Sequence, residues 1–434
     1  MSLDSSASSW VELRMQAFQL FRQGIAASDP EAAVASALKA RESDIAAARG
    51  VILIALGKAA CLMTGTALRF VGDKLRRACV VTSRENVLDI EGIEVIVGGH
   101  PLPDEGSLEA GRAIEEAVRS ASPEDLMLLL ISGGGSALVC APAPGISLAD
   151  KVALNEALVR CGADISEINA VRQIFSRLKG GRLAELTSGA KTLSLVLSDV
   201  PGDDVATIAS GPTAKPATGV SDAVIVLRRH NLLKVLPAIM RRQLDDLVAG
   251  EDRACASFDH VENVVIGSNA ISLQRMMDSA KERYFTVIKA ADWLNGDVSE
   301  AAHALHGLAL VTARHEGPVA IVAGGETTVR VRGSGRGGRN QELALRFALL
   351  NERQPIRRPW VFLSGGTDGR DGPTDAAGAL VDPGSTERMR RHGCKPEAHL
   401  RNNDSYPALA TSGDLLLTGP TGTNVADLQI LLMK

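Results

Sequence analysis

The sequence predicts an α/β protein of two domains built around mainly parallel sheets. The chain has 434 residues, more than a single domain usually holds. Apolar residues make up 45% of it, which is enough for sizeable cores. Short apolar runs alternate with helical patterns along most of its length, and this alternation is typical of parallel sheets covered by helices.

The expected strands are mostly continuous apolar runs, as in a sheet whose two faces are both covered by helices. They are expected at Val51–Leu56, Ala78–Thr82, Glu94–Val97, Leu126–Ile131, Thr192–Ser198, Asn263–Ile266, Phe285–Lys289, Val319–Ala323, Val361–Leu363 and Leu415–Thr418. Helical patterns lie between them, among others at Ser107–Ser120, Ser147–Arg160, Ser221–His230 and Asp297–Arg314. The polar stretch around Ala249–Asp259 separates two such blocks. It places the domains at residues 1–250 and 251–434.

Composition and charge exclude several classes of partner. Aromatic residues make up only 3% of the chain, so platforms that stack nucleic-acid bases are not expected. The formal net charge of −4 gives no general attraction to nucleic acid or to anionic membranes. Any basic site must therefore be local.

The cysteines and the N-terminus indicate a cytoplasmic protein. The six cysteines contain no Cys-x-x-Cys pair, which excludes a zinc knuckle or a dithiol redox motif; they are Cys61, Cys79, Cys140, Cys161, Cys255 and Cys394. The first residues carry Asp4 and several serines where a signal peptide would have lysine or arginine, and Trp10, Leu13, Phe18 and Phe21 fit one face of a helix. No apolar run approaches the roughly 20 residues that span a bilayer. The sequence permits a homo-oligomer.

Two glycine-containing loops follow expected strands, where open parallel sheets collect their ligands. Val51–Leu56 ends in Gly57-Lys58, and Lys58 can neutralise a phosphate or a carboxylate at a helix start. The spacing is not that of a Walker A loop, and a solvated lysine is the alternative interpretation. Leu126–Ile131 is followed by Gly133, Gly134, Gly135 and Ser136. Three glycines let the backbone approach an oxyanion closely, although a tight turn would also require glycine.

Carboxylates follow other strands. Asp199 and Asp203 come after Thr192–Ser198, Glu326 follows Val319–Ala323, and Asp368 lies in a segment rich in Gly and Asp. Carboxylates at strand ends can hold a metal ion or accept a hydroxyl proton. Each of them alone could instead cap a helix or a turn, which is the commoner role of aspartate in loops.

A cationic glycine-rich loop spans Gly333–Gln341. It matches the dinucleotide pattern G-x-G-x-x-G, and Glu352 lies at the offset of about 20 residues where a ribose-binding acid stands. The preceding segment, Val329–Arg332, is expected as a strand but carries two arginines, unlike the buried strand of a dinucleotide site. Arg336 and Arg339 add two guanidiniums, which suit a transferring phosphoryl group. The pattern alone is weak, and a dinucleotide site remains an alternative.

Taken together, the motifs resemble one family. The matching segments are Gly57-Lys58-Ala59, Gly99-His100-Pro101-Leu102-Pro103, Ile131–Ala137, Ser198–Asp203, Gly337–Glu342, Ser364–Gly369 and Gly419–Asn424. In these segments the chain is similar to class II glycerate 2-kinases, which pair an N-terminal glycerate-kinase domain with a C-terminal MOFRL-type domain. The resemblance keeps the same order of motifs and runs from Phe18 to the C-terminus.

The resemblance implies a fold and a reaction. The expected fold is a Rossmann-like N-terminal domain with a mainly parallel sheet and a smaller α/β C-terminal domain, with the active site in the interdomain cleft. The expected reaction is ATP- and Mg²⁺-dependent phosphorylation of D-glycerate at its 2-hydroxyl, giving 2-phosphoglycerate. The family's essential lysine falls on Lys58, and its essential arginine on Arg339, with Arg336 as the competitor. Some relatives carry the name hydroxypyruvate reductase.

These expectations give a hypothesis for each candidate residue. Lys58 and Arg339 would bind the transferring phosphate and the glycerate carboxylate, while Asp199 would orient or deprotonate the 2-hydroxyl. Residues expected to bind substrate or phosphate are Gly133, Gly134, Gly135, Ser136, Arg336 and Asn340. Those expected at the metal ion and the nucleotide are Glu326, Asp368, Asp203 and Asn424. Two alternatives are an NAD(P)H-dependent hydroxypyruvate reductase and a non-catalytic sensor of sugar phosphates or nucleotides.

Overall fold

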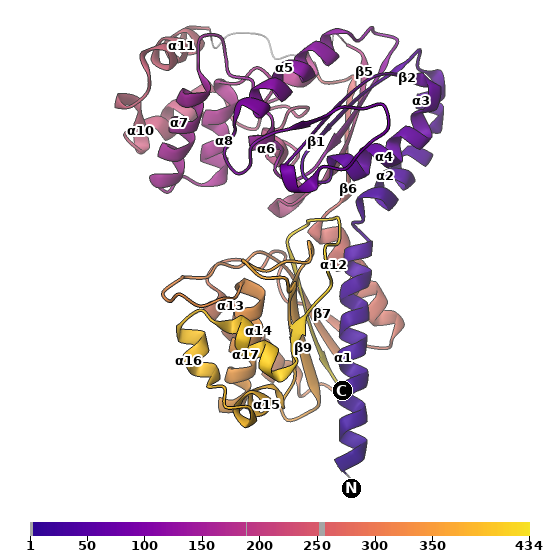
Figure 1. Cartoon of the computed structure of the whole chain (residues 1–434), viewed down its shortest axis with the longest axis vertical. Coiled ribbons are helices and arrows are strands. Elements are labelled where there is room, and N and C mark those ends of the chain that lie inside the picture. Colours follow the sequence, from indigo (N-terminus) through magenta and orange to yellow (C-terminus); the bar gives the residue numbers. More distant parts are fainter. Residues whose placement is uncertain (1–2, 188, 251–256) are drawn as a thin grey trace. The chain divides into compact units, whose positions relative to one another are not determined.

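The structure, a computed structural model, describes residues 3–187, 189–250 and 257–434. They form two compact units (Figure 1). The central unit comprises Pro30–Ile266, and the terminal unit combines Met1–Asp29 with Gly267–Lys434. Cys255 and the expected division after residue 250 fall at or within the segment outside the described residues.

The central unit alternates strands with helices. Its strands are β1 (Val51–Leu56), β2 (Leu75–Thr82), β3 (Val95–Val97), β4 (Leu126–Ile131), β5 (Lys191–Leu197) and β6 (Val261–Gly267). Its α-helices are α2 (Pro30–Lys39), α3 (Glu42–Ala47), α4 (Ala60–Val71), α5 (Glu105–Arg119), α6 (Gly135–Leu138), α7 (Leu148–Arg160), α8 (Ile165–Ile174), α9 (Arg182–Glu185), α10 (Val220–Arg229) and α11 (Ala238–Ala249).

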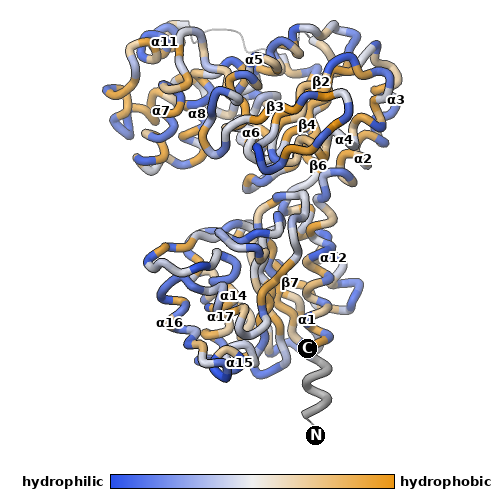
Figure 2. Tube along the Cα trace, viewed as in Figure 1, coloured by the Kyte–Doolittle hydropathy of each residue, from blue (hydrophilic) through white to orange (hydrophobic). Residues whose placement is uncertain are grey.

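The sheet of the central unit has the order β3-β2-β1-β4-β5-β6, which is the strand order of the Rossmann fold. Strand pairs from β3 through β5 are all parallel. Alternate residues of β1 serve two cores: Val51 and Leu53 pack with α2 and α4, whereas Ile52 and Ile54 pack with α5. Coverage on both faces explains why these strands are continuous apolar runs, visible as orange tubes in Figure 2. The expected Rossmann-like domain is confirmed.

The terminal unit carries a second sheet. Its strands are β7 (Thr286–Lys289), β8 (Val319–Gly325), β9 (Trp360–Gly366), β10 (Gly378–Val381), β11 (Leu415–Leu416) and β12 (Asp427–Met433). Its helices are α1 (Leu3–Ala26), α12 (Asn269–Glu282), α13 (Val298–Thr312), α14 (Arg339–Arg353), α15 (Ser385–Arg391), α16 (Pro396–Arg401) and α17 (Ser405–Ser412).

This second sheet is mixed, with the order β11-β10-β9-β12-β8-β7, and only β7–β8 pairs in parallel among its pairs. The expectation of mainly parallel sheets is therefore wrong for the terminal unit. The physical reason is that the sequence analysis did not predict two strands, β10 and β12, and every antiparallel pair of this sheet contains one of them. Strand β12 inserts between β8 and β9 and runs antiparallel to both, a pairing that needs no crossover helix.

Helix α1 explains why the terminal unit contains both ends of the described chain. Its apolar face packs into the core beneath the second sheet, where Leu13, Leu20 and Phe21 are fully buried. Arg14 of the same helix forms ion pairs with Asp382 at 2.5 Å and Asp414 at 3.0 Å. The compact units thus differ from the expected ranges 1–250 and 251–434, because β6 continues the first sheet and α1 belongs to the second.

Four further helices of the central unit, α7, α8, α10 and α11, form a helical layer with its own core. Leu158 of α7, Val171 of α8, Leu227 of α10 and Met240 of α11 share one core. Among the described residues no helix is long and apolar enough to cross a membrane.

We predict that Leu20→Ala destabilises the terminal unit by about 2–5 kcal/mol, because it leaves a cavity in a packed core. The matched control Val11→Ala changes the same helix at a side chain that is 65% exposed and should cost less than about 0.5 kcal/mol. Tryptophan fluorescence during urea unfolding reports the terminal unit specifically, since Trp10, Trp293 and Trp360 all belong to it. Equal midpoints for the two variants would contradict the packing of α1.

Candidate active site

The loops after β1 and β4 are joined directly. These strands are neighbours at the point where the strand order reverses, which is where open α/β sheets bind ligands. The backbone N–H of Lys58 donates to the Gly133 carbonyl at 2.9 Å, and that of Ala59 donates to Ser132 Oγ at 3.1 Å. The two sequence motifs, predicted separately, are therefore hydrogen-bonded to each other at the carboxyl ends of β1 and β4.

The glycine loop leads into the short helix α6. Gly134 takes a left-handed backbone, with φ of 87°, and is the N-cap of α6, so Gly135 starts the helix. Ser136 Oγ lies 2.9 Å from Ser210 Oγ. A Cβ built on Gly133 would lie 2.2 Å from Asp199 Oδ2, so a side chain there would collide with the carboxylate. The glycines thus let Asp199 approach the loop.

Asp199 and Lys58 interact at these strand ends. Burial raises the pKa of Asp199, while its own backbone N–H and the Lys58 ammonium act in the opposite direction. Lys58 also lowers the pKa of His100, after the larger effect of burial. The Cβ position of Gly134 lies 3.2 Å from the His100 ring and 3.5 Å from the Lys58 side chain. A cation, an aspartate with a raised pKa and an imidazole therefore surround the glycine loop.

Sequence reasoning missed the groups that support this loop. Lys179 is 7% exposed and its Nζ donates to the Ser136 carbonyl at 2.5 Å. Burial, together with the nearby Lys151 and Arg172, lowers the pKa of Lys179 to about 7. The available signal was Lys179-Gly180-Gly181, a glycine pair beside a lysine that no strand precedes. His100 was identified only as part of a matching motif.

Asp203 of the central unit lies in the turn after β5. Its backbone is left-handed, with φ of 55°, and its side chain is partly exposed. It belongs to a different compact unit from Glu326, Asp368 and Asn424, the other residues expected at the metal ion and the nucleotide. The prediction that these residues share one site, between the domains, stays a prediction.

Arg339, the first residue of α14, binds two carboxylates at the ends of the central strands of the second sheet, a region called here the acidic edge. Its Nε and Nη2 donate to the two oxygens of Asp427, at 2.6 and 2.9 Å, and its Nη1 lies 2.8 Å from Glu326 Oε1. Asp427 begins β12 and pairs with Gly325 and Gly366, the last residues of β8 and β9, so β12 starts where its two neighbours end. Burial lowers the pKa of Arg339, but the carboxylates outweigh burial and hold it above the ordinary value.

Asp371 caps the start of α14. It is 2% exposed and accepts the backbone N–H groups of Asn340 at 3.1 Å and Gln341 at 2.8 Å. Burial raises the pKa of Asp371 to about 7, against these two hydrogen bonds. The Asn340 side chain is also buried and accepts a hydrogen bond from Ser364 Oγ at 2.5 Å. Asn340 therefore supports the helix start, and sequence reasoning did not identify Asp371 or Asp427.

Acidic groups exceed basic ones at this edge. A Cβ on Gly366 would lie 3.2 Å from Asp368 Oδ1 and 3.5 Å from Asp427 Oδ1, so Asp368 lies at the end of β9 beside Asp427. Asp368 Oδ1 accepts the backbone N–H of Arg370 at 2.9 Å. Four carboxylates (Asp368, Asp371, Asp427 and Glu326) and one guanidinium give a formal charge of −3 when all are ionised. An edge of this sign favours a divalent cation over a bare phosphate.

Asn424 lies in the loop before β12, where its Oδ1 accepts the backbone N–H of Ala426 at 3.3 Å. Within the described residues, no group of three His, Cys, Asp or Glu side chains could hold a metal ion by itself. Magnesium in phosphoryl-transfer sites is commonly bound through one or two carboxylates together with substrate phosphates. The acidic edge fits that mode, and it does not fit a cage made only of protein ligands.

Arg336 lies in the exposed part of the loop. Its guanidinium stacks over the Tyr406 ring at 4.3 Å, and its Nη2 is 3.7 Å from Asp375. Arg339, by contrast, is partly buried among the carboxylates. The two arginines that the sequence could not rank thus have very different surroundings.

The loop Gly333–Gly338 does not have the surroundings of a dinucleotide site. The segment Val329–Arg332, expected as a strand, is irregular, so no strand leads directly into the loop. The backbone N–H groups at the start of α14 are already accepted by Asp371, and a pyrophosphate would have to displace it. In the Rossmann sheet itself, the turn after β1 reads Gly57-Lys58-Ala59, without the glycine pattern.

Comparisons with known proteins agree with this two-part organisation. Residues 16–245 match a domain of unknown function, DUF4147, and residues 319–427 match the MOFRL family. A D-glycerate 2-kinase from Thermotoga maritima is 38% identical, over 97% of this chain and 98% of its own. A putative hydroxypyruvate reductase from Agrobacterium vitis is 40% identical, over 88% of this chain and 99% of its own.

Among solved structures, a crystal structure of glycerate kinase from Thermotoga maritima has a TM-score of 0.88 and 37% sequence identity, covering 98% of this chain and 100% of that one. The similarity extends over both units. A second relative, a glycerate 2-kinase from Pyrococcus horikoshii, is 36% identical over 98% of this chain and 98% of its own. The chain therefore belongs to the class II glycerate kinase family, with a DUF4147 region followed by a MOFRL region.

Proposed function

We propose that the protein is an ATP-dependent kinase that phosphorylates D-glycerate at its 2-hydroxyl to give 2-phosphoglycerate. The observation that carries the proposal is the placement of Lys58 and Asp199 around the glycine loop at the switch point of the central sheet. Phosphoryl transfer requires mainly positioning and neutralisation of charge, which a cation, backbone amides and a base can supply. The names of the relatives support the substrate.

In this proposal the central unit binds the hydroxy acid. Lys58 neutralises the carboxylate of glycerate or the transferring phosphate, and the loop Gly133–Ser136 offers backbone N–H groups to the same oxygens. Asp199 accepts the proton of the 2-hydroxyl as its oxygen bonds to the γ-phosphorus of ATP and the bond to ADP breaks. The pKa of Asp199 is shifted upward by burial, the direction that strengthens a carboxylate as a general base.

The acidic edge of the terminal unit is our candidate for the magnesium site. We assign Glu326 and Asp368 as its protein ligands, and Asp203 and Asn424 remain candidates at the nucleotide. Bound Mg²⁺ would neutralise charge on the nucleotide phosphates. Arg339 keeps Asp427 and Glu326 in place, and two of its five N–H groups remain for a phosphate after its three contacts with carboxylates.

The partners in this proposal are small molecules, D-glycerate and ATP. The scattered cysteines of the sequence, without a paired motif, support a cytoplasmic location. Nothing in the composition favours nucleic acid or a membrane as a partner.

A reductase is the second candidate, because a relative that is 40% identical carries that name. The structure of the terminal unit argues against it, since the start of α14 is already capped by Asp371. One assay separates the candidates: purified protein with D-glycerate and Mg-ATP in one arm, and hydroxypyruvate with NADH in the other. We expect ADP in the first arm and no NADH oxidation in the second; the reverse result would exclude the kinase, and silence in both would favour a sensor.

Lys58→Ala should lower the rate of ADP formation roughly 10²–10³-fold, because it removes the fixed positive charge that stabilises the transferring phosphoryl group. The matched control Lys39→Ala removes an exposed lysine from α2 of the same unit and should leave the rate unchanged. Circular dichroism should be alike for both variants. Near-normal turnover by Lys58→Ala would remove this residue from the mechanism.

Asp199→Asn tests the general base through the pH profile. The base must be ionised, so kcat/KM of the unmodified enzyme should fall as pH drops through the raised pKa of Asp199. In Asp199→Asn the rate should be about 10²–10⁴-fold lower and this acidic limb should disappear. The control Asp245→Asn, at an exposed position of α11, should keep both the rate and the limb. An unchanged limb in Asp199→Asn would assign it to another group.

Substitution of each loop arginine by lysine ranks the two candidates. Arg339→Lys keeps the charge but loses the bidentate contact with Asp427, and we expect at least a tenfold fall in kcat, about 1.4 kcal/mol. Arg336→Lys changes an exposed stack on Tyr406 and should alter kcat less than about twofold. Thermal unfolding of both variants checks that folding is retained. A larger loss in Arg336→Lys would reverse the assignment.

A further inference from the structure

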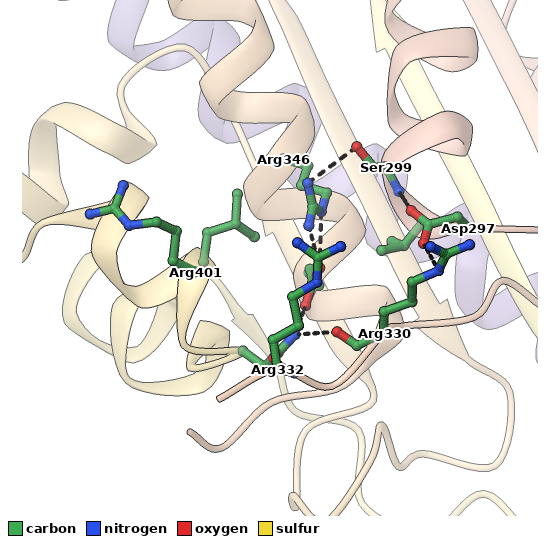
Figure 3. A pocket seen from close by; sticks show the side chains of 10 residues that line it. Asp297, Ser299, Arg330, Arg332, Arg346 and Arg401 are labelled. Carbon is green, nitrogen blue, oxygen red and sulfur yellow. Dashed lines mark hydrogen bonds and ion pairs between the residues drawn. The ribbon is translucent and has the colours of Figure 1, made fainter. Parts of the chain in front are cut away.

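The terminal unit contains a cavity lined by four arginines, here called the arginine pocket (Figure 3). Its volume is about 300 Å³. The arginines come from three separate segments: the loop after β8, helix α14 and the end of α16. They are Arg330, Arg332, Arg346 and Arg401. None of them belongs to the residues assigned above to the reaction.

The charges of the pocket do not cancel. Arg346 is paired with Glu342, at 2.9 and 2.7 Å, and Arg330 lies 3.6 Å from Asp297. Arg332 and Arg401 have no carboxylate partner within the part of the chain that the structure describes. Four arginines and two acids leave a formal charge of +2 in the lining. Because the protein as a whole has a net charge of −4, the positive charge of this pocket is a local feature.

Other lining groups suit an anion as well. Ser299 Oγ accepts a hydrogen bond from Arg346 Nη1 at 3.2 Å, which leaves its own hydroxyl hydrogen to donate. Ser299 stands in the first turn of α13, a helix of fifteen residues whose dipole favours negative charge at this end. No aromatic side chain is among the described residues that line the pocket. A nucleobase would therefore find no stacking surface.

We propose that the arginine pocket binds a small phosphate monoester. A phosphate monoester carries about −1.5 to −2 charges at neutral pH, which matches the excess of +2, whereas a monocarboxylate would leave about one charge uncompensated. Guanidinium forks match phosphate oxygens in geometry. A volume of about 300 Å³ is at the lower limit of ligand pockets, so the ligand is smaller than a nucleotide. The proposal does not depend on the kinase activity.

An occupant would also hold the cationic loop in place. The loop docks on the turn after α16: the N–H groups of Arg332 and Gly333 donate to Asn403 Oδ1 at 2.7 and 3.1 Å. The Arg336 N–H donates to Asp404 Oδ1 at 2.8 Å. Of the two segments that meet here, Arg332 belongs to the one that leads into the cationic loop, and Arg401 is the last residue of α16. A phosphate that contacts both arginines would stabilise the docking of the loop on the turn after α16, and so order the loop that leads to Arg339.

The test is calorimetric titration of the full chain with glycerol 3-phosphate at low salt. We expect saturable binding by the unmodified protein and at least a tenfold loss of affinity in the double variant Arg332→Gln, Arg401→Gln, since two charged hydrogen-bonding groups are removed. The control Arg357→Gln, an exposed arginine of the same unit, should bind normally. Lys58→Ala should also bind normally, which separates this pocket from the glycine loop of the central unit.

Hydrogen exchange supplies the second readout. Glycerol 3-phosphate should slow exchange at the amides of Arg332, Gly333 and Arg336 in the unmodified protein and leave them unchanged in the double variant. Absence of binding, equal affinity of the double variant, loss of binding in Lys58→Ala alone, or equally tight binding of D-glycerate would each overturn the proposal. Thermal unfolding of the double variant should match the unmodified protein, because both arginines are exposed.

Discussion

The parallel pairing of β1 with β4 is the constraint on which the proposed chemistry depends. Because these strands lie next to each other in the same direction, their carboxyl ends coincide, and the loops that follow leave the sheet together. Lys58 and the glycine loop are separated by more than seventy residues in sequence, yet a backbone hydrogen bond of 2.9 Å joins them. Asp199 arrives from the next strand along, β5, and only glycine leaves room for its carboxylate. The pairing of neighbouring strands thus brings a cation, backbone amides and a base to one place.

In the terminal unit, too, neighbouring strands bring functional side chains together, but these side chains are mainly carboxylates. Its three central strands bring Glu326, Asp427 and Asp368 to one edge, and a single guanidinium from α14 neutralises part of their charge. Asp427 has no exposed surface, so Arg339 is required simply to keep a buried carboxylate paired. Arg339 therefore pairs a buried carboxylate and still keeps N–H groups for a ligand.

Sequence reasoning predicted the central unit well because its signals are local. A buried parallel strand is a continuous apolar run, and glycine and lysine residues mark the loops after β1 and β4 in the sequence. The terminal unit was harder, since β12 was not among the expected strands and nothing local in the sequence indicates that it inserts between β8 and β9. The roles of Asp371 and Asp427 escaped for the same reason: burial of a carboxylate is decided by distant partners. Asn340 illustrates the converse, a polar residue in the right motif whose side chain turns inward.

The pairing of α1 with the terminal unit has a consequence for synthesis. The ribosome makes α1 before the whole central unit, and only afterwards the strands that α1 covers. The central unit has all its strands from β1 to β5 in hand and can fold while translation continues, as domains commonly do. The apolar face of α1 stays unpartnered until α12, the first partner in its core to be made, has emerged, and that core is complete only with β12. A nascent chain of this protein therefore carries an exposed hydrophobic helix for most of its elongation, and we regard that helix as the segment most in need of a chaperone.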